Sequence, residues 1–272
     1  MSVSYVTAFL DLQRESWSSF SRTFDAYLAA FTPFLSLFTG SDSRFIVFID
    51  KRHIHTVQRL VNGTPNILLV EISEPFLETH SVLWRRLPRE LEIIQSEDEY
   101  RRWTVHRQRY PENTNPRYTL INHCKIDFVN LAMEKDIHSE YFCWVDFGYF
   151  SKPENIPTAL LDIEKLDKEK INYTLVSPVI PEEDRDYIYT LQAAPERIGG
   201  FFFFGSRKSM ISYQKLYHKV HSKFQTLGIV DDDQYIALQC YFVQPSLFAL
   251  HYVGGWHKAL IAFQTSACAS HR

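Results

Sequence analysis

Four short segments of the sequence hold polar side chains where they could do chemistry. The first is the aromatic stretch YFCWVDFGY at residues 141–149, in which Asp146 is the single acid. A carboxylate at the carboxyl end of a mid-sheet strand lies where open α/β sheets bind ligands, and its oxygens suit a hard divalent cation. The alternative is a turn residue that ends the strand, and Asp146 alone does not separate the two interpretations.

Glycine and phenylalanine dominate the second segment, IGGFFFFGS at residues 198–206. Gly199 and Gly200 allow close backbone approach or a positive φ. The segment predicts a ring-walled floor for a sugar or another flat ligand. An interior strand with turn glycines is the alternative.

The third segment is an acid cluster, VDDDQ at residues 230–234. Three adjacent carboxylates repel one another, and one of them can cap the helix that follows. The others are free to act as a general base, to bind hydroxyls or to approach a metal, and Asp232 and Asp233 are our candidates. A solvated helix start is the alternative.

The fourth segment, HYVGGWHK, occupies residues 251–258. His251 at a strand end could supply a metal ligand, and Lys258, with His257 beside it, could bind phosphate oxygens. A histidine on a strand is also a common structural residue, which is the alternative here.

Strand and helix patterns alternate along the chain and must position these segments. We expect strands at residues 4–10, 45–49, 67–72, 141–145, 173–179, 197–206 and 247–253, and helices at 24–38, 53–61, 118–133, 207–224 and 231–242. Apolar strands separated by helices are typical of a parallel sheet covered on both faces. Residues 75–116, rich in Arg, Glu, Trp and Pro, are predicted to be an insertion or lid outside the sheet.

The composition is that of an ordinary globular protein. The net charge of −3 provides no basic field for a nucleic-acid backbone, so we expect no nucleic-acid partner. The four cysteines lack CxxC spacing and predict a reducing compartment without a zinc site. We see no signal peptide and no apolar run of about 18 residues that could span a membrane. The predicted location is therefore the cytoplasm, or the host cytoplasm if the protein is viral.

The order of the four segments resembles the GT-A class of nucleotide-sugar glycosyltransferases. The resemblance is closer to HtrL/YibB-type proteins and their relatives among glycosyltransferases of large algal viruses (chloroviruses). It rests on VTAF at residues 6–9 with Arg14, on residues 122–125, on WVDFG and on RIGGFFFFGS, and it spans residues 5–258. Where that class has a DxD motif, Asp146 stands alone, because Trp144 and Gly148 occupy the neighbouring places.

The resemblance implies a single GT-A domain over residues 1–272, with a Rossmann-like, mostly parallel central sheet flanked by helices. Residues 1–150 would be the nucleotide-binding half, with the insertion at about 75–116, and residues 151–272 the acceptor and donor-sugar half. The implied reaction transfers a sugar from a nucleoside diphosphate sugar, with UDP favoured, to an oligosaccharide or glycoprotein hydroxyl. Inversion is weakly favoured over retention.

The resemblance also implies roles for individual residues. Asp146 and His251 would hold Mn²⁺ or Mg²⁺, and Asp232 or Asp233 would be the general base. The remaining donor-binding residues would be Thr7, Ala8, Phe9, Arg14, Lys125, Gly199, Gly200, His257 and Lys258. A metal-dependent phosphatase or nuclease, and a non-catalytic glycan-binding module, are the alternative functions.

Overall fold

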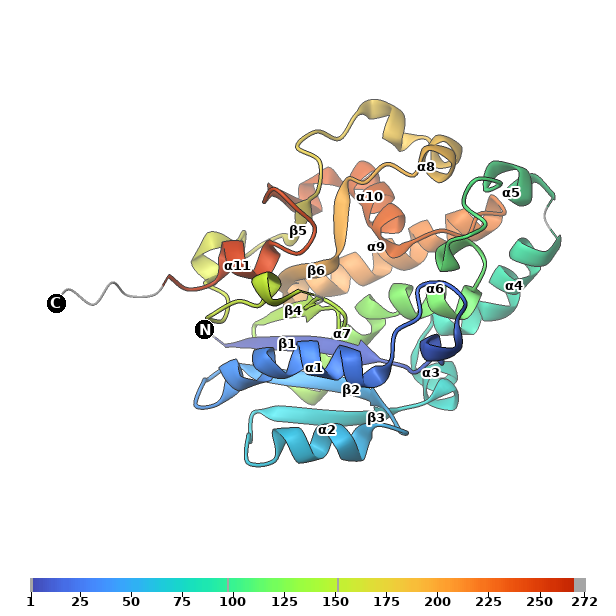
Figure 1. Ribbon diagram of the computed structural model, residues 1–272. Helices are drawn as coiled ribbons and strands as arrows, with labels where there is room; N and C mark the ends of the chain where they lie inside the picture. The colour runs from blue at the N-terminus through green and yellow to red at the C-terminus, as the bar shows by residue number, and fades with distance from the viewer. Residues whose placement is uncertain (1, 97, 151, 267–272) are drawn as a thin grey trace.

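The computed structural model describes residues 2–96, 98–150 and 152–266, and within them seven strands form one central sheet (Figure 1). The strands are β1 (Val3–Phe9), β2 (Arg44–Asp50), β3 (Ile67–Ile72), β4 (Tyr141–Val145), β5 (Ile171–Leu175), β6 (Ile198–Ser206) and β7 (Phe248–Tyr252), in the order β3-β2-β1-β4-β6-β5-β7. Strand β6 runs antiparallel to β4 and β5, whereas the other neighbouring pairs are parallel. The expected α/β fold with a mostly parallel sheet is confirmed.

Helices cover both faces of this sheet (Figure 1). One face packs against α1 (Phe24–Leu35), α2 (Ile54–Val61) and α11 (Ala259–Phe263). The opposite face packs against residues of α3 (Glu74–His80), α4 (Leu87–Ser96), α5 (Asp98–Trp103), α6 (Pro116–His123), α7 (Lys125–Lys135), α8 (Tyr187–Ala193), α9 (Arg207–Thr226) and α10 (Asp233–Val243).

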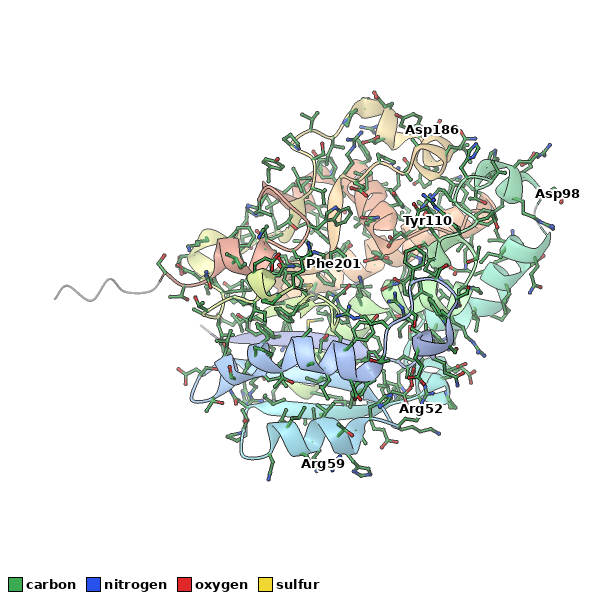
Figure 2. All side chains as sticks on the ribbon, viewed as in Figure 1. Arg52, Arg59, Asp98, Tyr110, Asp186 and Phe201 are labelled. Carbon is green, nitrogen blue, oxygen red and sulfur yellow. The ribbon has the colours of Figure 1, made fainter. Side chains whose placement is uncertain are left out.

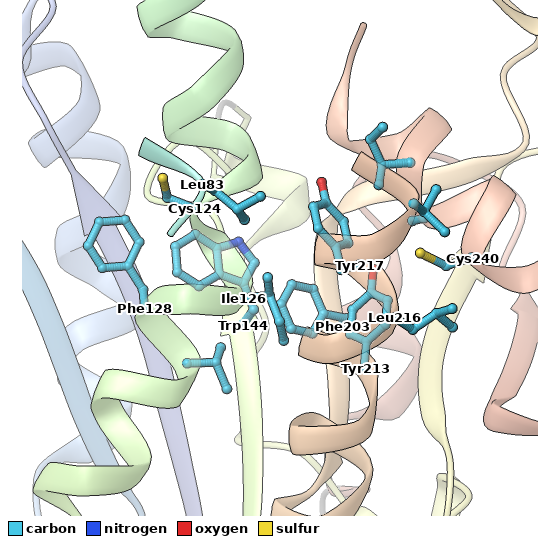
Figure 3. Packing of buried hydrophobic residues seen from close by; sticks show 14 of the residues in the cluster. Leu83, Cys124, Ile126, Phe128, Trp144, Phe203, Tyr213, Leu216, Tyr217 and Cys240 are labelled. Carbon is cyan, nitrogen blue, oxygen red and sulfur yellow. The ribbon is translucent and has the colours of Figure 1, made fainter. Parts of the chain in front are cut away.

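Strand β2 shows why the sheet needs both helical layers. Phe45, Val47 and Ile49 belong to the apolar cluster on one face, while Ile46 and Phe48 belong to the cluster on the other. Successive side chains of a strand point to opposite faces, so an uninterrupted apolar run is buried on both sides. Figure 3 shows the second cluster, in which rings from α7, β4, β6 and α9 lie side by side.

Two predicted elements differ from the structure. The single helix expected at residues 118–133 is two helices that join at Cys124, so that Lys125 becomes the first residue of α7. The strand expected at 173–179 ends at Leu175, shortly before Pro178, which cannot donate to a strand ladder.

Residues 75–116 contribute no strand to the sheet in their described part, and they pack against the second half of the chain. Arg86 donates to the carbonyl of His218 at 3.1 Å, and the Tyr100 hydroxyl donates to that of Val230 at 3.1 Å. Cys124, Cys143 and Cys240 are free and buried, as expected, whereas Cys268 lies outside the described residues. Every helix in the described part of the chain is too short or too polar to span a bilayer.

Candidate functional site

The candidate site lies where three strands meet at one edge of the sheet. Parallel strands β1 and β4 both end there, and antiparallel β6 begins there. The register pairs Val145 with Phe202, and the Asp146 amide donates to the Phe201 carbonyl at 3.0 Å. The strand-end acid and the glycine pair of β6 are therefore neighbours.

A buried ammonium group lies at the centre of this edge. Lys125 Nζ is 3.0 Å from Asp146 Oδ1, 3.2 Å from Asp146 Oδ2, 2.8 Å from Asp233 Oδ2 and 3.0 Å from the Gly200 carbonyl oxygen. Only 7% of the Lys125 side chain is exposed. We call Lys125, Asp146, Gly200 and Asp233 the Lys125 cluster, and all four members are among the residues predicted from the sequence.

Electrostatics keep the lysine charged despite its burial. Burial opposes the ammonium form, but the charges of Asp146 and Asp233 outweigh it and raise the pKa of Lys125 above its usual value. The Lys125 cluster therefore contains a permanent positive charge at neutral pH.

Trp144 explains the lone acid in WVDFG. Its indole Nε1 donates to Asp146 Oδ1 at 2.6 Å, and residues two apart on a strand share one face. Trp144, at one of the two positions where a DxD motif would have its other acid, thus holds the Asp146 carboxylate in place.

Gly200 is required by close packing. A Cβ at this position would lie 2.7 Å from Asp233 Oδ2, closer than carbon and oxygen tolerate. The glycine therefore lets Asp233 approach β6 and reach Lys125. This contact gives a physical reason for one glycine of IGGFFFFGS.

The three acids of VDDDQ take different positions. Asp231 is buried and forms a bidentate ion pair with Arg107, at 2.9 and 3.1 Å. Burial raises the pKa of Asp231 to about 6, although Arg107 opposes the shift. Asp232 and Asp233 line a cavity, so the first acid is structural and the other two face a possible ligand.

Asp232 and Asp233 titrate as neighbours at the start of α10. Burial and the adjacent Asp232 charge raise the pKa of Asp233. Burial also opposes the charge on Asp232, but a hydrogen bond with Asp233 and the charge of Lys125 lower its pKa. Asp232 is therefore the member of the pair that stays ionised more readily.

Two cavities, of about 230 and 250 Å³, meet at the Lys125 cluster. The first lies toward β1 and α1, and the second lies toward α10. They share a wall made of Tyr118, Asn122, Lys125, Asp146 and Phe201. Phe201, labelled in Figure 2, marks the place where the two cavities adjoin.

The first cavity combines aromatic rings with charged side chains of both signs, because Asp11, Glu15 and Asp146 line it together with Arg14, Arg22 and Lys125. Ala8, Phe9 and Arg14, three of the residues proposed to bind the donor, line it, and Arg22 adds a further cation. Arg14 donates to the Tyr27 hydroxyl at 2.5 Å and lies 5.5 Å from the ring centroid of Tyr118. The rings of this wall suit a flat ligand, and its guanidinium groups can bind anionic groups of that ligand.

Other predicted residues lie away from these cavities. Thr7 is fully buried and lines neither cavity. Gly199 is also buried, lines neither cavity, and lies beside Thr174 and the Trp256 carbonyl. Lys258 precedes α11 and lines neither cavity, whereas its neighbour His257 lines the second.

The structure does not bring His251 to Asp146. His251 Nε2 lies 2.9 Å from Asn172 Oδ1, and its strand β7 is separated from β4 by β6 and β5. With roughly 4.8 Å between neighbouring strands, about 14 Å separates the two positions. The expected metal pair of Asp146 and His251 therefore does not fit one ion, because the strand order keeps its members apart.

Several residues of the site were missed from the sequence. Arg107 comes from the insertion, and Glu112, Tyr118 and Trp256 line the second cavity. Burial, together with the Asp232 charge, raises the pKa of Glu112 to about 7. Their sequence signal is weak, because an Arg, Glu, Tyr or Trp outside a motif is most often a packing or surface residue.

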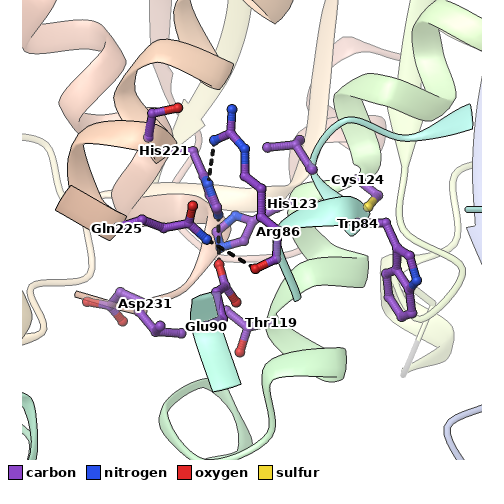
Figure 4. Close-up of polar contacts among 12 residues, drawn as sticks. Trp84, Arg86, Glu90, Thr119, His123, Cys124, His221, Gln225 and Asp231 are labelled. Atoms are coloured by element: carbon purple, nitrogen blue, oxygen red, sulfur yellow. Dashed lines mark hydrogen bonds and ion pairs between the residues drawn. The ribbon is translucent and has the colours of Figure 1, made fainter. Parts of the chain in front are cut away.

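A second polar cluster lies behind the acid motif (Figure 4). Potential ligand atoms of Glu90, His123 and His221 all lie within 4.8 Å of one another and could hold a metal ion. Here His221 Nε2 lies 2.9 Å from Glu90 Oε1, and Arg86 donates to His221 Nδ1 at 2.8 Å. Because Arg86 can only donate, His221 has its proton on Nε2 and donates it to Glu90.

Together, fold and site define an α/β protein of Rossmann type, with a two-part ligand cleft at the carboxyl edge of its sheet. The profile of the family described as "Bacterial protein of unknown function (HtrL_YibB)" matches residues 1–265, so the chain belongs to this family. Protein HtrL of Escherichia coli (strain K12) is 26% identical over 266 residues, which cover 93% of this chain and 88% of the relative.

The fold is also similar to a solved structure, the apo form of mouse xyloside xylosyltransferase 1. The TM-score is 0.47 and the sequence identity is 8%, with 92% of this chain and 85% of that chain covered. The expected membership of the HtrL/YibB family is confirmed, while the link to algal-virus enzymes stays a prediction.

Proposed function

We propose that the protein is a glycosyltransferase that moves a sugar from a UDP-sugar to a hydroxyl of a glycan acceptor. The observation that supports this most directly is the junction of the two cavities at Lys125 and Asp146. A cavity with aromatic rings and two arginines adjoins a cavity with three further acids, and the sugar would pass from a donor in the first to an acceptor in the second.

The donor would occupy the first cavity. Its rings offer stacking surfaces for a nucleobase, and Arg14 and Arg22 would bind the diphosphate oxygens. Lys125 borders the same cavity and supplies the positive charge nearest the cavity junction. The donor sugar would then lie beside Gly200 and Phe201.

The acceptor would occupy the second cavity, with Asp232 as the general base. Its ionised carboxylate would take the proton of the acceptor hydroxyl while that oxygen bonds to the anomeric carbon. The bond between this carbon and the phosphate oxygen breaks, and its electron pair leaves with the diphosphate. These steps invert the configuration at the anomeric carbon, which is the outcome that the sequence analysis favoured.

A divalent metal, Mn²⁺ or Mg²⁺, was predicted at Asp146 and His251. Within the cleft, both Asp146 oxygens contact Lys125, and His251 contacts Asn172 instead. These residues do not form the expected ion site, so no step is assigned to a metal here.

The test combines donor binding with a base substitution. We expect a thermal-shift screen of UDP-, GDP- and dTDP-sugars to show stabilisation by the UDP-sugars. We expect Asp232→Asn to bind the same donor while slow donor hydrolysis or transfer falls about 100-fold or more, as for loss of a general base. Asp42→Asn, an exposed acid, is the matched control.

Three outcomes would contradict this proposal. A loss below about tenfold, or roughly 1.4 kcal/mol of barrier, would remove Asp232 as the base. If no nucleotide sugar bound in the screen, the proposal of a glycosyltransferase would be contradicted. Hydrolysis of simple phosphate esters would favour the hydrolase, and glycan binding without donor binding would favour the glycan-binding module.

A further inference from the structure

We propose that Lys125 is a built-in cation that takes the place of a divalent metal in this site. The inference deepens the proposed function and rests on it for the identity of the donor. It assigns to one side chain the charge that would balance the leaving diphosphate.

The surroundings of Lys125 Nζ are those of a bound cation. Two carboxylates and one backbone carbonyl supply four oxygens at 2.8 to 3.2 Å. Carboxylate and carbonyl oxygens are also the ligands that hard divalent cations prefer. The oxygen set is therefore present, and an ammonium group occupies its centre.

The fold anchors this ammonium group in the cleft. Lys125 is the first residue of α7, and the lysine is 6% exposed. Trp144 Nε1 already donates to Asp146 Oδ1, and Gly200 lacks the Cβ that would displace Asp233. Asp146 and Asp233 are thus held where their carboxylates contact the charged amino group of Lys125.

The position of Lys125 also suits stabilisation of the diphosphate as it leaves the sugar. It borders both cavities, so its positive charge lies close to the region where the sugar–phosphate bond would break, while its N–H groups bond to Asp146, Gly200 and Asp233. Negative charge grows on the diphosphate as that bond breaks, and a fixed cation in a partly buried site stabilises it. Arg14 and Arg22 are two further cations in the first cavity, where Asp11 and Glu15 also lie.

One consequence can be measured without any nucleotide. Lys125→Met removes the ammonium group and leaves two carboxylates facing each other with no counter-charge. We expect this variant to bind one more Mn²⁺ than the wild type, measured from the free Mn²⁺ signal in electron paramagnetic resonance, and to gain thermal stability from the ion. The double variant Lys125→Met/Asp233→Asn should lose the extra site.

This comparison also removes the contribution of the cluster around Glu90, which is unchanged in all three proteins. The proposal would be overturned if the wild type bound Mn²⁺ and lost it in Asp146→Asn or Asp233→Asn. It would equally be overturned if a folded Lys125→Met, checked by circular dichroism, gained no site.

A second measurement uses the wild type alone, so it holds even if Lys125→Met fails to fold. We expect the Kd for UDP in EDTA to lie within about twofold of that in Mn²⁺, because the lysine already provides the charge. Binding about tenfold tighter with Mn²⁺ would overturn the inference and leave the glycosyltransferase proposal intact. Absence of UDP binding in both buffers would contradict the proposed function, while the Mn²⁺ titrations would still decide the role of Lys125 as a cation.

Discussion

Glu90 offers a stability prediction that can be worked out from its surroundings. Its carboxyl group is 1% exposed, and burial raises its pKa from 4.5 to about 8, against the nearby Gln225 and Arg86. Glu90 Oε1 accepts from His221, whereas Oε2 has no hydrogen-bond partner in the described structure. We therefore expect Glu90 to be protonated in the folded protein at neutral pH.

A raised pKa means that the folded state binds this proton more tightly than the unfolded state does. The resulting stabilisation is fully present below pH 4.5 and is lost as the pH rises toward 8. Between pH 5.5 and 7.5, the wild type should lose about 2–3 kcal/mol of unfolding free energy through this one group. Glu90→Gln, which cannot ionise, should not show that loss.

The assay is urea unfolding followed by tryptophan fluorescence at the two pH values, in EDTA. The quantity of interest is the free energy of unfolding of Glu90→Gln minus that of the wild type, which should rise by about 2–3 kcal/mol. Glu92→Gln is the matched control, because Glu92 lies on the same helix with its side chain 61% exposed. Other buried acids cancel in the difference.

A difference that stayed constant within about 0.5 kcal/mol would refute this reasoning. A difference that fell with pH would show that Glu90 is ionised and paired. A metal bound to Glu90, His123 and His221 would have that effect, and a parallel series with added Zn²⁺ would reveal it.

Two further substitutions test the packing of the cleft. Gly200→Ala should cost about 1–3 kcal/mol of stability and abolish donor binding, because its Cβ would displace Asp233 from Lys125; urea unfolding and calorimetry with UDP measure the two effects. Arg107→Met should cost about 3–5 kcal/mol in urea unfolding, because it leaves the Asp231 carboxylate buried without its partner.

Each of these substitutions has a matched control. Gly255→Ala adds a Cβ that meets Lys258 Cγ at an ordinary 3.5 Å, and Arg102→Met removes an exposed arginine whose ion pair spans 3.9 Å. Losses in the controls as large as in the test variants would show that the close contacts do not explain the effects.

The first half of the sheet could be predicted from the sequence because its strands are short apolar runs. Residues 67–72 and 141–145 match β3 and β4 at both ends. The direction of β6 could not be predicted, because antiparallel pairing to β4 and β5 depends on neighbours that are distant in the chain. The break between α6 and α7 at Cys124 could not be predicted either, because the helical spacing of apolar residues continues through it.

The site was predictable in its members but not in their contacts. Asp146 and Asp233 were proposed from local patterns and Lys125 from the family resemblance, yet none of these signals places the ammonium group between the two carboxylates. The proposed pairing of Asp146 with His251 failed to fit for the same reason. Both residues end strands at one edge, but only the strand order shows that β6 and β5 lie between them.

The predicted lid at residues 75–116 cannot be a freely opening flap along its whole length. Arg107 is 11% exposed and pairs with the fully buried Asp231, while Tyr100 donates to the carbonyl of Val230. Opening this part would separate a buried ion pair, at a cost of about 3–5 kcal/mol if one charge were left without its partner. The segment around Arg107 is therefore held against Asp231, directly before the start of α10.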